Sequence, residues 1–344
     1  MTQPAASPSA SLKRRIAFMF APLVAFNAGV WIWAFAVFGD HPALLGTCAL
    51  AYVLGLRHAV DPDHIAAIDN VTRKLMQEGR QPISVGLWFA IGHSALICIA
   101  VCAIAFTATS LSDERFEGWR EIGGVVSTIC SATFLFIIAA FNMMVLANVW
   151  SSYRALRRTG HYAEERIEEL LKNRGFLARF MQPCFALVSR GWHMFPLGFL
   201  FGLGFDTATE VSLFSIAATE SARGFSLASI MIFPLLFTAG MALIDTMDGV
   251  LMLGAYHWAY VKPRRKLIYN LVITTLSVVV ALCIGLLETL ALLGAKFDLT
   301  DGVWSAVAAL NAHYGDLGFV IIALFATVWL GAWLAQRSKR VATP

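Results

Sequence analysis

Charged residues are scarce in this chain of 344 residues. Aspartate, glutamate, lysine and arginine together make up 14% of it, whereas an average soluble domain has about 25%. Hydrophobic residues make up 58%, and the mean hydropathy is +0.68. This composition excludes an ordinary soluble domain and predicts an integral membrane protein.

A small number of cysteines and the absence of two motifs exclude further classes of protein. The chain has only six cysteines, mostly within apolar segments, so an extracellular disulfide framework is not expected. No GxxxxGK[ST] sequence occurs, which argues against ATP hydrolysis by this chain. No HExxH sequence occurs either, which argues against a zinc hydrolase of that type. The net charge of +4 follows from membrane topology and requires no nucleic-acid partner.

What the sequence does have is a series of long apolar segments. Each is long enough to cross a hydrocarbon core of about 30 Å, which takes roughly 20 helical residues. We therefore predict an all-α, polytopic membrane protein with about eight transmembrane helices. The segments lie near residues 16–38, 43–66, 83–109, 122–148, 196–219, 226–255, 268–294 and 316–336.

The basic residues predict how these helices are oriented. Most of the 26 lysines and arginines fall at or between alternate segment ends, and such clusters mark the cytoplasmic side. We expect a disordered cytoplasmic N-terminus (1–15), a single transmembrane domain (16–336) with a cytoplasmic loop at about 150–195, and a cytoplasmic C-terminus (337–344). The loop contains a stretch that resembles an interfacial helix. The expected location is the cytoplasmic (inner) membrane, in contact with lipid.

Ionisable residues nevertheless occur inside the predicted spans. A charged side chain at the centre of a membrane helix costs about 2.5–3.5 kcal/mol on insertion scales, so a group of them needs a common purpose. Helix rise and orientation bring several of them to overlapping depths in the inner half of the membrane. The candidate metal ligands are His58, Asp61, Asp63, His64, His93, Asp206, Glu210, Asp245 and Asp248.

Imidazole nitrogens mixed with carboxylate oxygens indicate a particular class of ion. Carboxylates alone would repel one another, but a divalent cation among them neutralises the charge. Such a mixed set suits Ni²⁺, Co²⁺, Zn²⁺ or Cu²⁺, and it suits Mg²⁺ and Ca²⁺ poorly because they prefer oxygen ligands. Arg57 cannot bind a metal, and we expect it to be a counter-charge to an aspartate.

Pro62 predicts a break within the second span. It lacks an amide hydrogen, and it disfavours helical geometry at Asp61. In a regular helix His58, Asp61 and His64 would lie along one stripe, whereas Asp63 would point elsewhere. Broken helices of this kind line cavities in transporters.

Several other interpretations remain open. The segment around Asp61 and Asp63 could be a cytoplasmic loop that follows a span ending near residue 56. His93 could bond to a neighbouring backbone, and Asp245 with Asp248 could cap a helix end. We expect Glu288 to lie at the membrane interface near the outer end of its span. Residues 69–70 are expected to end a helix in the cytoplasm.

Four motifs give the chain a family resemblance. They are RHAVDPDHI (57–65), FAIGHS (89–94), LGFDTATE (203–210) and GMALIDTMDG (240–249). In sequence and order they resemble the nickel/cobalt transporter (NiCoT) family of eight-span permeases, and in particular its high-affinity nickel permeases. The resemblance implies uptake of Ni²⁺, in some members also Co²⁺, with His58, Asp61, Asp63 and His64 essential. Pro62 stands where the family motif usually has alanine.

The expected function is therefore high-affinity uptake of Ni²⁺, and also of Co²⁺ if the chain follows the wider family. The uptake would be driven by the membrane potential or a proton gradient. We expect no resident cofactor, no ATPase subunit and no enzymatic activity. The main alternative is a divalent metal efflux carrier or metal/proton exchanger, and a membrane metalloenzyme is a second one.

Overall fold

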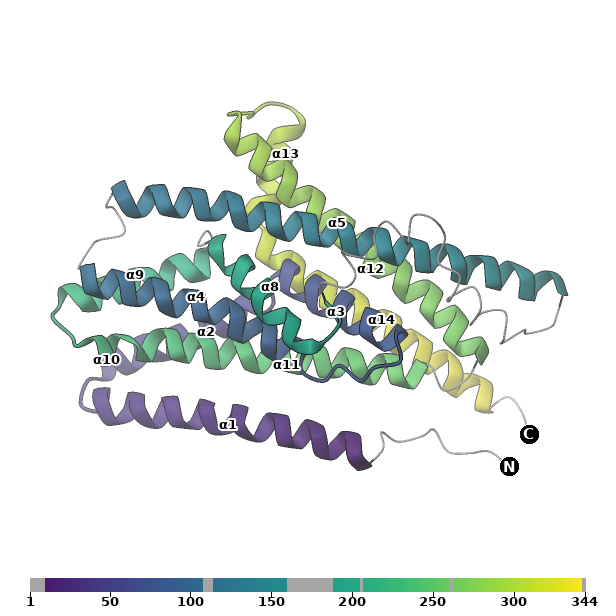
Figure 1. The fold of residues 1–344 in the computed structure, drawn as a ribbon, viewed down its shortest axis with the longest axis horizontal. Helices are drawn as coiled ribbons and strands as arrows, with labels where there is room; N and C mark the ends of the chain where they lie inside the picture. The colour runs from purple at the N-terminus through teal and green to yellow at the C-terminus, as the bar shows by residue number, and fades with distance from the viewer. Residues whose placement is uncertain (1–9, 108–113, 160–187, 205–206, 260–262, 342–344) are drawn as a thin grey trace.

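The computed structural model describes residues 10–107, 114–159, 188–204, 207–259 and 263–341. All secondary-structure elements within these ranges are helices, which confirms the all-α class. Most of the long helices run side by side along the long axis of the molecule (Figure 1). The helix predicted within the loop at 150–195 falls mainly on 160–187, outside the described residues.

In chain order, the helices of the described residues are α1 (Ala10–Phe38), α2 (Pro42–His58), α3 (Pro62–Gln77), α4 (Val85–Thr107), α5 (Glu114–Thr159), η1 (Gly191–His193), α8 (Met194–Phe201), η2 (Gly202–Gly204), α9 (Ala208–Ala222), α10 (Leu227–Ile230), α11 (Ile232–Ala259), α12 (Pro263–Lys296), α13 (Val303–Ala312) and α14 (Tyr314–Val341).

The described helices do not confirm the predicted count of eight spans. Within the described residues, five helices are long and apolar enough to cross a membrane. Two bent pairs, α2 with α3 and α13 with α14, raise the number to seven if each pair forms one span. The predicted segment 196–219 is divided between α8 and α9, and each of these helices is too short to span alone.

The break between α2 and α3 has a local cause. Asp61 has an extended backbone (φ −66°, ψ 144°), and α3 begins at Pro62. A residue before proline is pushed toward extended geometry, and proline fits the first position of a helix because its missing amide hydrogen is not needed there. The two helices meet at 52°. The break predicted at Pro62 is confirmed.

The start of α9 is fixed by a side-chain cap. The Thr207 backbone is extended, and its hydroxyl accepts a hydrogen bond from the backbone amide of Glu210. Threonine at this position, followed three residues later by glutamate, is the capping-box pattern of a helix N-terminus. The cap places the Glu210 side chain in the first turn of α9.

Three hydrophobic clusters hold the bundle together. The first joins α1, α2, α4, α9, α10 and α11. The second joins α3, α5, α12 and α14, and the third joins α3, α4, α5 and α8. Since α3 belongs to the second and third clusters and α2 to the first, the chain crosses from one group of helices to another at the break before Pro62.

Glycines allow the backbones of α4 and α8 to contact each other directly. A Cβ atom at Gly92 would overlap the carbonyl of Phe195, and one at Gly198 would overlap the carbonyl of Phe89. Small residues at membrane-helix contacts commonly permit such an approach. The close contact brings α8 against the part of α4 that carries His93.

Candidate metal-binding site

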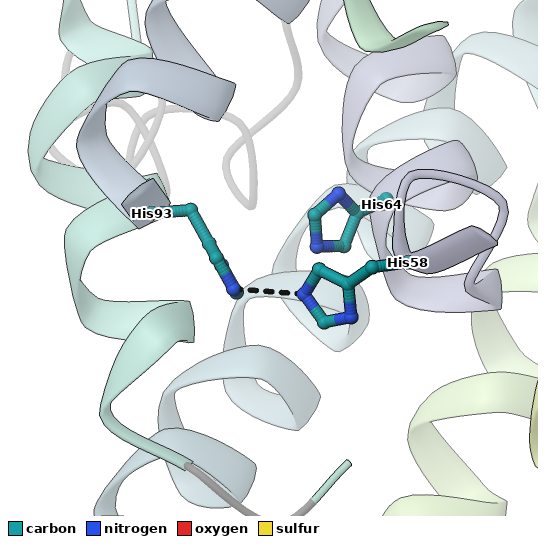
Figure 2. A group of neighbouring side chains, drawn as sticks. All are labelled: His58, His64 and His93. Carbon is teal, nitrogen blue, oxygen red and sulfur yellow. Dashed lines mark hydrogen bonds between the residues drawn. The ribbon is translucent and has the colours of Figure 1, made fainter. Parts of the chain in front are cut away.

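Three histidines from three helices meet in the interior of the bundle. His58 ends α2, His64 lies in the first turn of α3 and His93 lies on α4. Each is at most 2% exposed. Figure 2 shows the rings facing one another, with His93 opposite His58 and His64. One ring nitrogen from each lies within 4.8 Å of the other two, so the three imidazoles are close enough together to be a candidate metal-binding group.

Glu210 adds an oxygen to this group. The Nε2 atoms of His58 and His93 are 2.9 Å apart. The Oε1 atom of Glu210 lies 3.1 Å from His93 Nε2 and 3.9 Å from His58 Nε2. Its other oxygen accepts a hydrogen bond from the Thr207 hydroxyl at 2.9 Å. The cap of α9 therefore directs Oε1 toward the two imidazoles.

The second nitrogen of His58 is held by polar groups around it. His58 Nδ1 lies 3.1 Å from Asp61 Oδ2 and 3.0 Å from the Thr209 hydroxyl. Arg57 in turn donates to the other oxygen of Asp61 at 2.8 Å, as expected for a counter-charge. A metal-binding histidine usually donates its other N–H to a carboxylate in this way. Asp61 thus supports the ring of His58 and leaves Nε2 facing His93.

His64 has the same arrangement. Its Nδ1 atom lies 3.3 Å from Asp245 Oδ2, and both side chains are fully buried. Its Nε2 atom is buried and has no hydrogen-bond partner among the described residues. A buried nitrogen without a partner is costly, because it has lost its contact with water. An ion at the centre of the three rings would supply the missing interaction.

Asp63 and Asp248, two further predicted ligands that the structure describes, are not among the side chains at the ring centre. Asp63 lines the adjacent cavity. Asp248 lies one turn beyond Asp245 on α11, within electrostatic range of Asp69, and its buried Oδ2 has no hydrogen-bond partner among the described residues. Asp206 lies outside the described residues. Among the described residues, the side chains at the centre are therefore the three histidines and Glu210, while Asp61 and Asp245 contact the Nδ1 atoms of His58 and His64, on the far side of those rings.

A cavity of about 1000 Å³ lies beside the histidines. His58, His93 and Glu210 line it together with the first part of α5, the last part of α12 and the junction of α13 with α14. These three regions are far apart in the chain, and the cavity extends from the candidate site to all of them.

Two expectations about polar residues were wrong. Glu288 was expected at the membrane interface, but it lines the cavity and accepts hydrogen bonds from Tyr314 at 2.7 Å and Ser131 at 3.1 Å. Asp69 and Asn70 were expected to end a helix in the cytoplasm, but both are fully buried within α3. Asp69 accepts a hydrogen bond from Ser277 at 2.7 Å, so packing against α12 compensates for its burial.

Two threonines of the DTATE motif belong to the site, although neither was among the residues predicted from the sequence. The hydroxyl oxygens of Thr207 and Thr209 are 3.1 Å apart. The Thr207 hydroxyl donates to Glu210, and the Thr209 hydroxyl contacts Nδ1 of His58, so the two threonines connect Glu210 to His58. The capping pattern at the start of a helix that carries a buried acid could have found Thr207, whereas no local pattern indicates Thr209.

Comparison with known proteins gives a consistent result. A family model described as "High-affinity nickel-transport protein" matches residues 44–335. The high-affinity nickel transport protein of Cupriavidus necator is 54% identical over 328 residues, covering 95% of this chain and 93% of that protein. The high-affinity nickel-transport protein NixA of Helicobacter pylori strain 26695 is 40% identical, covering 87% and 91%.

A relative named for cobalt matches as well. The cobalt transport protein NhlF of Rhodococcus rhodochrous is 37% identical, covering 95% of this chain and 94% of that protein. No solved structure matches the chain. The family model spans most of the chain, and relatives well above 30% identity extend over nearly its full length. The chain belongs to the high-affinity nickel-transport protein family.

Proposed function

We propose that this chain takes up Ni²⁺, and also Co²⁺, across the cytoplasmic membrane, and that the ion binds between His58, His64, His93 and Glu210. The names of its relatives support the two ions. The observation that carries the proposal is the convergence of three buried imidazoles on one point, beside a carboxylate and at a cavity.

The donor set favours a borderline transition-metal ion. Three imidazole nitrogens beside a carboxylate oxygen suit Ni²⁺, Co²⁺, Zn²⁺ or Cu²⁺, whereas Mg²⁺ and Ca²⁺ prefer oxygen ligands. The Nε2 atoms of His58 and His93 are at hydrogen-bond distance, 2.9 Å, and a bound ion would replace this contact. Within this class of ions, Ni²⁺ and Co²⁺ are chosen from the names of the relatives.

The proposed route starts at the cavity. If both termini are cytoplasmic, α12 ends on the outer side, so the cavity is open to the outside. A hydrated ion would enter there, pass Asp63 and exchange water for His58, His93 and Glu210. His64 would bind through Nε2 while Asp245 holds its other nitrogen. Asp61 holds His58 in the same way, and Asp206 and Asp248 remain candidate ligands along the route.

The membrane potential would favour inward movement. It contributes about 2.3 kcal/mol per charge per 100 mV, hence about 4.6 kcal/mol for a divalent ion. On this proposal the chain needs no ATPase subunit and no resident cofactor, and it acts as a carrier rather than an enzyme. Efflux or metal/proton exchange through the same site is the alternative, and the direction of flux distinguishes them.

Uptake of radiolabelled nickel tests this function. Cells that lack other nickel importers should accumulate nickel when they express the wild-type chain, and His93→Ala should reduce accumulation to background. His41→Ala is the matched control, because His41 is exposed and remote from the site. If cells that express the wild-type chain accumulate less nickel than cells that do not express it, the result would favour efflux. An unimpaired His93→Ala variant would contradict the proposed site.

A further inference from the structure

The start of α14 lies against Arg57, although none of the four candidate ligand side chains belongs to α14. The Arg57 guanidinium carbon lies 5.2 Å from the centre of the Phe319 ring, which is the geometry of a cation–π contact. A Cβ atom at Gly315 would overlap the end of the same guanidinium. Gly315 and Phe319 are one helical turn apart, so together they form the surface on which Arg57 rests.

Arg57 is connected to a candidate ligand through one carboxylate. Its Nη1 atom donates to Asp61 Oδ1 at 2.8 Å, and Asp61 Oδ2 lies 3.1 Å from Nδ1 of His58. A displacement of the guanidinium therefore acts on Asp61, which holds the ring of His58. The side chain of Arg57 is 30% exposed and that of Asp61 is 8% exposed. Holding a long arginine side chain in one geometry costs conformational entropy, so contacts with neighbouring groups help to fix it.

The start of α14 is itself anchored. The hydroxyl of Tyr314, the residue before Gly315, donates to Glu288 on α12 at 2.7 Å. Glu288 also accepts from Ser131 on α5. On the next turn, a Cβ atom at Gly318 would overlap the carbonyl of Val60, so α14 touches the break between α2 and α3 directly. Two bent helix pairs, α2 with α3 and α13 with α14, thus meet here, with bends of 52° and 75°.

We propose that Gly315 and Phe319 are positioning residues for the metal site. They fix the position of the Arg57 guanidinium, and through Asp61 they fix the orientation of the His58 ring. The helix break between α13 and α14 thereby determines how tightly the ion is held. This inference rests on the proposed function and assigns to α14 a role in affinity without any contact with the ion.

The substitution Gly315→Ala tests the proposal with the addition of one methyl group. The methyl group meets the flexible end of Arg57 rather than backbone, so α14 can keep its place while the guanidinium moves. We expect the KM for nickel uptake to rise about five- to twentyfold with little change in the maximal rate, because partners behind metal ligands alter affinity by about 10–100-fold. Gly331→Ala is the matched control on the same helix, since nothing lies within 4 Å of a Cβ atom there.

A double-mutant cycle separates positioning from damage to packing. Lysine at position 57 has no guanidinium group for the new methyl group to meet, so Gly315→Ala should change the KM little in an Arg57→Lys background. An equal effect of Gly315→Ala with arginine and with lysine would overturn the proposal, because Gly315 would then act through packing alone. A wild-type KM for Gly315→Ala would overturn it as well.

A second variant removes the other contact with Arg57. Phe319→Leu keeps an apolar side chain but loses the aromatic face beneath the guanidinium, and its KM should rise in the same direction as that of Gly315→Ala. The wild type and Gly331→Ala should import nickel with equal KM. If the KM of Phe319→Leu equals theirs, Phe319 has no positioning role. If the wild type imports no nickel, the proposed function itself fails, and the two failures are thus distinguished.

Discussion

The Nδ1 atom of His64 lies 3.3 Å from a carboxylate oxygen of Asp245, on a helix 181 residues later in the chain. Both side chains are fully buried. When the neutral imidazole carries its proton on Nδ1, the carboxylate accepts a hydrogen bond from Nδ1–H, and Nε2 is left as the free nitrogen for an ion. The contact therefore connects α3 to α11 and selects the atom of His64 that faces the other two histidines.

Removing the charge of Asp245 should weaken metal binding without abolishing it. In Asp245→Asn the amide oxygen can still accept from His64, but the negative charge that favours a cation is lost. We expect the affinity for Ni²⁺ to fall about 10–100-fold, measured by calorimetry on the purified protein. Asp298→Asn is the matched control, because Asp298 is exposed in a loop. Unchanged affinity in Asp245→Asn would show that the contact does not support the site.

Glu210 should matter more, since its oxygen faces the imidazoles directly. Glu210→Gln keeps an oxygen that can accept from Thr207, so the start of α9 should be preserved. It loses the negative charge beside His93, and its NH₂ group competes for the place of the ion. We expect nickel uptake to fall by at least about tenfold, while gel filtration shows a folded protein. A variant with wild-type uptake would exclude Glu210 as a ligand.

Much of this site could be predicted from sequence because its residues stand out against apolar helices. A histidine or acid in a long apolar segment is visible at once, and the break at Pro62 follows from the chemistry of proline. What the sequence could not give was the side-chain orientation. Asp61 and Glu210 were both predicted as candidate metal ligands, but Asp61 contacts the Nδ1 atom of His58, whereas Glu210 faces the Nε2 atoms at the centre.

Glu288 and Asp69 show a different limit. Position along an apolar segment gives depth, but it does not give the neighbours from other helices. Glu288 is at a cavity wall because the bend between α13 and α14 brings Tyr314 to it. Asp69 is buried because Ser277 of α12 packs against it. Both contacts join residues of different helices, and nothing in the local pattern of either segment indicates them.

The Thr209 hydroxyl should contribute modestly to affinity through His58. Thr209→Val keeps the shape of the side chain but removes the oxygen that lies 3.0 Å from His58 Nδ1. Because Asp61 still holds that nitrogen, we expect the KM for nickel to rise only a few-fold, consistent with a hydrogen bond worth about 0.5–1.5 kcal/mol. Thr275→Val is the matched control, since its exposed hydroxyl bonds only to its own helix. Complete loss of uptake in Thr209→Val would contradict a supporting role of this size.

A bound ion should stabilise the folded protein by an amount that grows with the logarithm of its concentration above Kd. A ligand that binds only the native state adds about 2.7 kcal/mol at a concentration of 100 times Kd, so Ni²⁺ should raise the Tm of the wild type in detergent. His58→Ala should lose this rise, whereas His41→Ala should keep it. If His58→Ala shows the full rise, the stabilising ion binds outside the three histidines.

The contact between α4 and α8 should be sensitive to a single methyl group. Gly92→Ala places a Cβ atom against the carbonyl of Phe195, and backbone cannot yield as a flexible side chain can. Overpacking of this kind costs about 1–3 kcal/mol, so the Tm in detergent should fall clearly. Gly254→Ala, on α11, adds the same methyl group where nothing lies within 4 Å, and it should leave the Tm unchanged. If both variants melt together with the wild type, α4 and α8 do not pack this closely, and the position of His93 opposite His58 would have to rest on other contacts.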